Sequence, residues 1–129
     1  MTKEFIICVI IVVLIVVGNV ITQNYTNDSV KEASESLYEL REELSKEEVN
    51  LDNAKRKIYE IYSDWSKRHD KLAYYIEHDE LEKVKTDLTG IKGYIEMEEY
   101  SEAVPELDRT VFVLEHIKNK NILNLENIF

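Results

Sequence analysis

The sequence predicts an all-α protein in which an N-terminal transmembrane helix precedes an antiparallel four-helix bundle. Three observations predict this fold class. Residues 5–21 are apolar except for Asn19, apolar residues recur at helical spacing through the rest of the chain, and its 129 residues include only three glycines and one proline. Rare helix breakers, with charged residues at 33% of the chain, favour long water-facing helices over a turn-rich sheet.

Residues 1–4 are a short N-terminal flank, and residues 5–21 are the expected membrane anchor. At about 1.5 Å per residue this run spans roughly 25 Å, close to the hydrocarbon thickness of about 30 Å. A cleaved signal peptide is the alternative, but no A-x-A cleavage site follows the run. We therefore expect a single-pass protein of the cell membrane. Lys3 before the anchor and acidic residues after it favour a cytoplasmic N-terminus and an extracytoplasmic helical domain.

After a juxtamembrane linker at residues 22–28, we expect a helical bundle over residues 29–120. Apolar residues recur there at gaps of three and four, which places them on one face of each of four helices. Short connections between such helices make neighbouring helices antiparallel. The four faces are Val30, Ala33, Leu37, Leu40 and Leu44; Ala54, Ile58, Ile61, Trp65, Leu72 and Ile76; Leu81, Val84, Leu88, Ile91 and Ile95; and Ala103, Leu107, Thr110, Val111, Leu114 and Ile117.

Two features predict helix boundaries inside the bundle. Ser45 and Glu48 form an S-x-x-E capping pattern and Asp52 is a second candidate cap, which together place a turn within residues 45–53. Pro105 is tolerated in the first turn of a helix, so the last helix should begin near Ser101.

The apolar faces also match each other in pairs. Adding 51 to each position of the first face gives the third face, and adding 49 to residues 54, 58, 61 and 65 gives residues 103, 107, 110 and 114, all apolar except Thr110. A duplicated helical hairpin would explain the match. The alternative is that any two amphipathic helices share a period.

The chain ends in an apolar segment. Residues 118–121 read Lys-Asn-Lys-Asn, which predicts the end of the last helix. Leaving the apolar residues beyond it in water would cost about 25 cal/mol per Å² of surface, so we expect residues 121–129 to pack on the bundle. A peptide offered to a partner is the alternative. The candidate interaction residues of this tail are Leu123, Leu125, Asn127, Ile128 and Phe129.

Several short motifs resemble a small bacterial family known only as a domain of unknown function, family 4363. The resemblance rests on the N-terminal anchor, Trp65, the run Ile76–Glu80, the run Leu114–Ile117 and the closing residues 123–129. The resemblance implies no established activity, ligand or catalytic residue. It implies that the protein comes from spore-forming, low-GC Gram-positive bacteria. In such bacteria, proteins of this family accompany another small multi-pass membrane protein, which is a possible partner.

The sequence offers little for catalysis or metal binding, and we expect no catalytic residue, cofactor or metal site. His78 and Glu82 are spaced i, i+4, but the inward-pointing E-x-x-H pairs of metal-binding bundles are absent. His69, His78 and His116 are therefore interpreted as helix-end or surface residues. The single cysteine, Cys8, lies in the anchor, and no nucleophile elbow or phosphate-binding glycine loop occurs.

Charge and architecture together predict the class of function. A net charge of −10 repels phosphate backbones, so nucleic acid is not an expected partner. We expect a non-enzymatic, membrane-anchored accessory protein that contacts the bilayer through residues 5–21 and associates with another membrane protein. The alternatives are an extracytoplasmic, sensor-like ligand-binding module and a structural component of the envelope.

Overall fold

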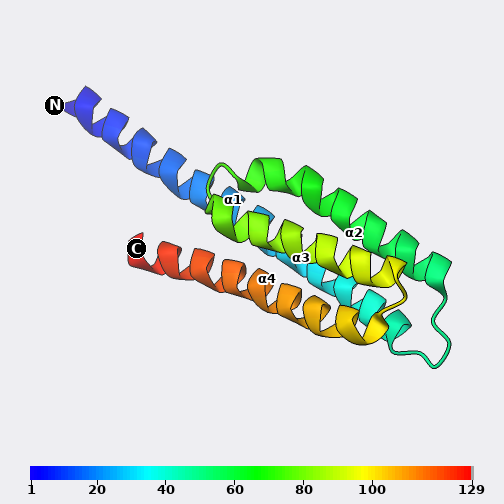
Figure 1. Cartoon of the computed structure of the whole chain (residues 1–129). Coiled ribbons are helices and arrows are strands. Elements are labelled where there is room, and N and C mark those ends of the chain that lie inside the picture. Colours follow the sequence, from blue (N-terminus) through cyan, green and yellow to red (C-terminus); the bar gives the residue numbers. More distant parts are fainter. Residues whose placement is uncertain (129) are drawn as a thin grey trace.

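Four helices make up the computed structural model, which describes residues 1–128 and, for residues 122–128, the backbone alone (Figure 1). They are α1 (Thr2–Leu44), α2 (Leu51–Leu72), α3 (His78–Glu96) and α4 (Tyr100–Ile128). No strand occurs among the described residues. The predicted all-α class with four packed helices is confirmed.

The helices form an antiparallel bundle in which each one packs on two neighbours. α1 packs on α2 and α4, and α3 packs on the same two helices. Figure 1 shows the first part of α1 projecting beyond the bundle as a single free helix. Its most apolar stretch of 18 residues is not buried at all. α1 is thus long and apolar enough to cross a membrane or to act as a signal sequence.

The core consists of the four apolar faces that the sequence predicts. Trp65 is the largest fully buried side chain, with 1% of its surface exposed. Thr110, the polar member of the faces, is also buried, and its hydroxyl donates to the Glu106 carbonyl at 2.8 Å. Ile76 is the exception, because α2 ends at Leu72 and leaves Ile76 partly buried in the α2–α3 connection.

The two pairs of matching faces occupy equivalent places in the structure. Residues 30, 33, 37, 40 and 44 of α1 and their counterparts 51 positions later in α3 are all buried. Residues 54, 58, 61 and 65 of α2 and their counterparts 49 positions later in α4 are all buried as well. The matched positions thus share burial in the core, and duplication of a helical hairpin remains a prediction about their origin.

Residues 22–28, expected as a linker, are helical, and α1 passes through them without a break. Neither glycine nor proline occurs among them. Thr22 and Thr26 donate their hydroxyls to carbonyls of the preceding turn, at 3.0 and 2.9 Å, and so need no water. Thr26 and Ser29 are buried. The bundle therefore begins within residues 22–28, which the sequence predicts to be a linker because they are polar.

The α1–α2 connection is organised by Glu43 and Asn50. Glu43, nearly buried at the end of α1, accepts from the Asn50 amide at 3.0 Å and from Lys46 Nζ at 2.7 Å. The bond from Lys46 and that from the Asn50 amide hold the pKa of Glu43 below its ordinary value. Asn50 caps α2 by accepting from the Asn53 amide. The turn thus lies where the sequence predicts it, with Asn50 in place of the predicted caps.

Both predicted boundaries of the last helix can be compared with α4. Its start at Tyr100 agrees with the predicted start near Ser101, and Pro105 lies in its second turn. The predicted end at residues 118–121 is wrong, because α4 continues to Ile128. Lys120 in this stretch pairs with Glu77 at 2.9 Å and Glu80 at 3.3 Å, which raises the pKa of Lys120 and ties α4 to α3. The packing predicted for the side chains of residues 122–129 lies outside the described residues.

α3 ends in a Schellman motif with an unusual residue at its left-handed position. The Glu99 amide donates to the Tyr94 carbonyl at 2.8 Å, and the Glu98 amide donates to the Ile95 carbonyl at 3.0 Å. Glu98 has φ of 57°, a conformation that favours glycine. We expect Glu98→Gly to raise the free energy of unfolding by about 1 kcal/mol, measured by thermal unfolding in detergent. Glu99→Gly, one residue later, should stabilise nothing, and an equal gain there would contradict this account.

Candidate functional site

The most distinctive part of the surface is the end of the bundle from which the apolar part of α1 emerges. Figure 1 shows the α2–α3 connection and the C-terminal end of α4 at this same end. Tyr74 in the connection is 89% exposed. Here the Lys71 side chain of α2 lies over an aromatic ring of α1, with Nζ 5.5 Å from the centre of the Tyr25 ring. We call this the anchor-proximal end, after the membrane anchor that the sequence predicts at residues 5–21.

Local structure at the anchor-proximal end brings the last turn of α2 close to the first turns of α3. After Leu72 the chain turns tightly, with the Ala73 amide donating to the His69 carbonyl at 2.9 Å and the Ile76 amide donating to the Leu72 carbonyl at 2.8 Å. α3 starts at His78, only a few residues later. This tight turn positions His69 of α2 opposite the first two turns of α3.

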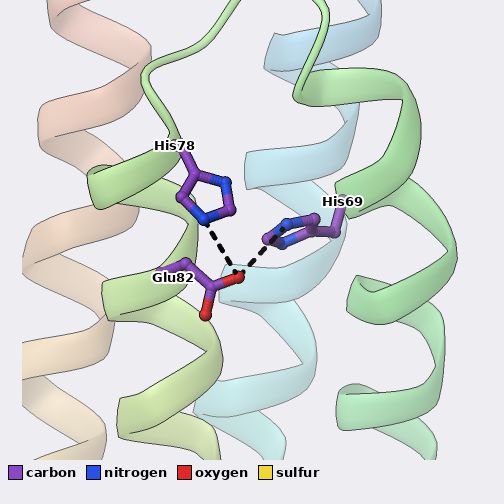
Figure 2. Close-up of side chains that lie close together, drawn as sticks. All are labelled: His69, His78 and Glu82. Atoms are coloured by element: carbon purple, nitrogen blue, oxygen red, sulfur yellow. Dashed lines mark ion pairs between the residues drawn. The ribbon is translucent and has the colours of Figure 1, made fainter.

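Three side chains meet across this turn. Figure 2 shows His78 and Glu82 of α3 and His69 of α2 projecting toward one another. The Nε2 atoms of His69 and His78 lie 3.6 and 3.7 Å from the same Glu82 oxygen, Oε1. The two imidazole rings are edge to face, with centres 6.1 Å apart and an interplanar angle of 88°. One possible donor atom from each residue lies within 4.8 Å of the other two.

The three residues differ sharply in burial. His69 is 8% exposed, and its Nδ1 has no hydrogen-bond partner among the described residues. His78 and Glu82 are open to solvent, with side chains 71% and 45% exposed. In this cluster the His69 side chain is thus held in the core, whereas the exposed side chains of His78 and Glu82 can change rotamer. The cluster offers two imidazole nitrogens and a carboxylate, a set of donors that could hold a metal ion.

The α1 side of the same end is held by Arg68. Its guanidinium donates to Ser29 Oγ of α1 at 3.0 Å, to Asp64 at 3.0 Å, and also to Glu32. Ser29 is fully buried, so this contact satisfies a polar group inside the helix interface. α2 is thereby locked to α1 within one turn of His69.

The candidate residues named from the sequence fall in three different environments. Trp65 is core, so it stabilises the bundle and is not available to a partner. His78 is the first residue of α3 and joins α2 and α3 through the cluster. His116 is on the α4 surface, with Nε2 3.5 Å from Glu80 Oε1. Leu123, Leu125, Asn127 and Ile128 lie on α4 with undescribed side chains, and Phe129 lies outside the described residues.

His69 is the residue that the sequence interpretation underrates. The sequence predicts it at a helix end or on the surface; it does lie in the last turn of α2, but it is buried. The signal was present, because His69 follows Trp65 by four residues and precedes Leu72 by three. That spacing continues the buried face, so a polar residue there needs a partner.

A second polar group is buried between α3 and α4. Asp87 is buried and its Oδ2 has no hydrogen-bond partner among the described residues. Glu106 of α4 lies beside it, with Arg109 at 3.1 Å on its other side. Burial raises the pKa of Glu106, the Asp87 charge raises it further, and Arg109 opposes both. Two neighbouring carboxylates on packed helices repel each other, so this pair destabilises the bundle at neutral pH.

We expect Asp87→Asn to raise the free energy of unfolding at pH 7 by about 1 kcal/mol, because an amide donates a hydrogen bond where a charge now repels. Glu106 has a raised folded-state pKa, so the folded form binds its proton more tightly than the unfolded form does. Its contribution to stability is therefore full below the ordinary value of 4.5 and is lost as the pH rises through the folded value. Urea unfolding at several pH values should show this slope flattening in Asp87→Asn but not in Glu115→Gln, an exposed acid on α4. An unchanged slope in Asp87→Asn would refute the coupling.

Comparison with known proteins identifies a family and nothing beyond it. A family model described as "Domain of unknown function (DUF4363)" matches residues 19–128, which confirms the resemblance found in the sequence. No curated protein and no solved structure matches the chain.

Proposed function

The chain belongs to the DUF4363 family of domains of unknown function, and from its architecture we propose a membrane-anchored, non-enzymatic accessory protein that associates with another membrane protein. The observation that carries this proposal is α1. None of its residues 5–21 is buried, and the same helix continues as one of the four bundle helices. A helix that is apolar on every side and not covered by its own chain is suited to lipid or to other transmembrane helices.

The anchor-proximal end supports a partner at the membrane surface. Arg41 of α1 pairs with Asp108 of α4 at 2.8 Å, which sets the register of these antiparallel helices. With the same rise in both, residue 121 lies level with about residue 28, and α4 beyond it runs level with roughly residues 20–27 of α1. The apolar C-terminal end of α4 therefore comes to the place where α1 enters the apolar segment.

The orientation is part of the proposal. Lys3 before the apolar segment and the acidic bundle after it favour a cytoplasmic N-terminus and an extracytoplasmic bundle. A single cysteine at Tyr59, an exposed position on α2, in a Cys8→Ser background would report the side of the bundle. A membrane-impermeant maleimide should label it in intact cells. Labelling only after cell lysis would reverse the orientation.

The association is tested by crosslinking the tagged full-length protein in cells, followed by detergent purification and mass spectrometry. We expect one multi-pass membrane protein to be recovered reproducibly. A variant lacking residues 121–129 should lose that protein while circular dichroism shows the remaining helices intact. Retained association would remove the role of this end, and recovery of the chain alone would overturn the accessory function.

A ligand-binding, sensor-like module is the second candidate, and the cluster of His69, His78 and Glu82 is the observation that favours it. The cluster links two helices at the anchor-proximal end, where a ligand would act on the connection between them. Thermal unfolding with and without divalent cations tests this candidate. An unchanged midpoint with every cation would count against it.

A further inference from the structure

We infer that His69, His78 and Glu82 form a binding site for a divalent transition-metal ion of the zinc type, which ties the last turn of α2 to the first two turns of α3. The site does not depend on whether the chain has a membrane partner. It would add a metal-responsive contact to the accessory protein proposed above.

The distances between the side chains suit a shared ion better than direct hydrogen bonds. Both Nε2 atoms approach Glu82 Oε1, at 3.6 and 3.7 Å, which is too long for a hydrogen bond. Ligand atoms about 2.1 Å from a tetrahedral zinc ion are about 3.4 Å from one another. Two separations are close to that value and the third is within 4.8 Å, so side-chain movements would bring all three donors to bonding distance from one ion.

The buried histidine supplies an independent reason. His69 is 8% exposed, and its Nε2 faces Glu82 Oε1 at 3.6 Å, beyond hydrogen-bond distance (Figure 2). An ion on Nε2 would give the imidazole a strong interaction where the protein offers only a distant carboxylate.

The donor set selects the kind of ion. Two imidazole nitrogens and one carboxylate oxygen suit Zn²⁺ and its transition-metal neighbours, whereas Ca²⁺ and Mg²⁺ prefer sites made of oxygen. Three protein ligands leave one tetrahedral position for water. Because His78 and Glu82 are exposed, an ion can enter from solvent without opening the bundle.

The chain contains a matched pair for comparison. His116 and Glu80 bring an imidazole nitrogen and a carboxylate oxygen to 3.5 Å on α4 and α3, with His116 about as exposed as His78. No third donor completes this pair among the groups of donors in the described residues. If simple histidine–carboxylate pairing explained the cluster, the two places would behave alike.

The test uses the full-length protein in detergent micelles, carrying an affinity tag without histidine and stripped of metal by EDTA. Zn²⁺ is titrated in competition with a fluorescent zinc chelator. We expect one zinc ion per chain, with affinity reduced at least about tenfold in both His78→Ala and Glu82→Gln and unchanged in His116→Ala. The substitutions are made at the exposed residues His78 and Glu82 because replacing the buried His69 could unfold the bundle.

Thermal unfolding gives the second readout. Zinc should raise the midpoint of the wild type and of His116→Ala but not that of His78→Ala, because only an intact site stabilises the folded state by mass action. No saturable site, or equal losses in His78→Ala and His116→Ala, would overturn the inference. The partner crosslinking described above is unaffected by either result.

Discussion

Replacing Trp65 by alanine is expected to lower the free energy of unfolding by about 3–5 kcal/mol, the largest effect of any single truncation in the bundle. Trp65 is 1% exposed in the middle of the apolar face of α2. Removing the indole leaves a cavity that four packed helices cannot easily close. For a bundle of this size the thermal midpoint should fall by at least about 12 °C.

The measurement is circular dichroism of the full chain in detergent during heating. Tyr59→Ala is the control, because Tyr59 lies on the same helix with 63% of its surface exposed and should change stability by no more than about 0.5 kcal/mol. Trp65→Phe should cost less than alanine, since it keeps an aromatic ring and removes the buried indole N–H that has no partner among the described residues. Equal effects of Trp65→Ala and Tyr59→Ala would show that Trp65 is not core.

Introducing proline at Asn24 is expected to break α1 between its apolar segment and the bundle. Asn24 is exposed and lies inside the uninterrupted helix. Proline there removes a helical hydrogen bond and clashes with the carbonyl four residues earlier, at a cost of about 3 kcal/mol. In amide hydrogen exchange, residues 21–25 should then lose roughly two orders of magnitude of protection.

Asn24→Ala controls for the loss of the side chain and should keep the protection of the wild type. Were residues 22–28 a flexible linker, these amides would exchange rapidly in the wild type and proline would change nothing. That outcome would restore the boundary that the sequence composition predicts and remove the continuous helix.

Most of the fold can be predicted from the spacing of the apolar residues. Gaps of three and four between residues such as Leu37, Leu40 and Leu44 define a helical face from local sequence alone, and all three are buried. Helix ends were less predictable, because they depend on contacts made across the bundle. Lys120 illustrates this: its polar surroundings predict a helix end, but it lies inside α4 and pairs with Glu77, just before α3, and with Glu80 of α3.

The candidate site could be predicted only in part. His78 and Glu82 are one turn apart on a helix, so their proximity follows from the sequence. The third member, His69, joins them through the tight turn after Leu72, and nothing in local spacing gives the direction of that turn. Polar character alone does not predict burial, and Thr26, Ser29 and His69 are all buried at this end.

If residues 5–21 cross a bilayer, as proposed, the uninterrupted α1 makes the bundle a lever on that bilayer. From Thr22 to Leu44 the helix is about 35 Å long, so a tilt of about 10° at the membrane would displace the α1–α2 connection sideways by about 6 Å. An apolar helix responds to membrane thickness by tilting or by deforming the lipid around it. Without a joint to absorb that tilt, a change in bilayer thickness would appear at the far tip of the protein as a change of position.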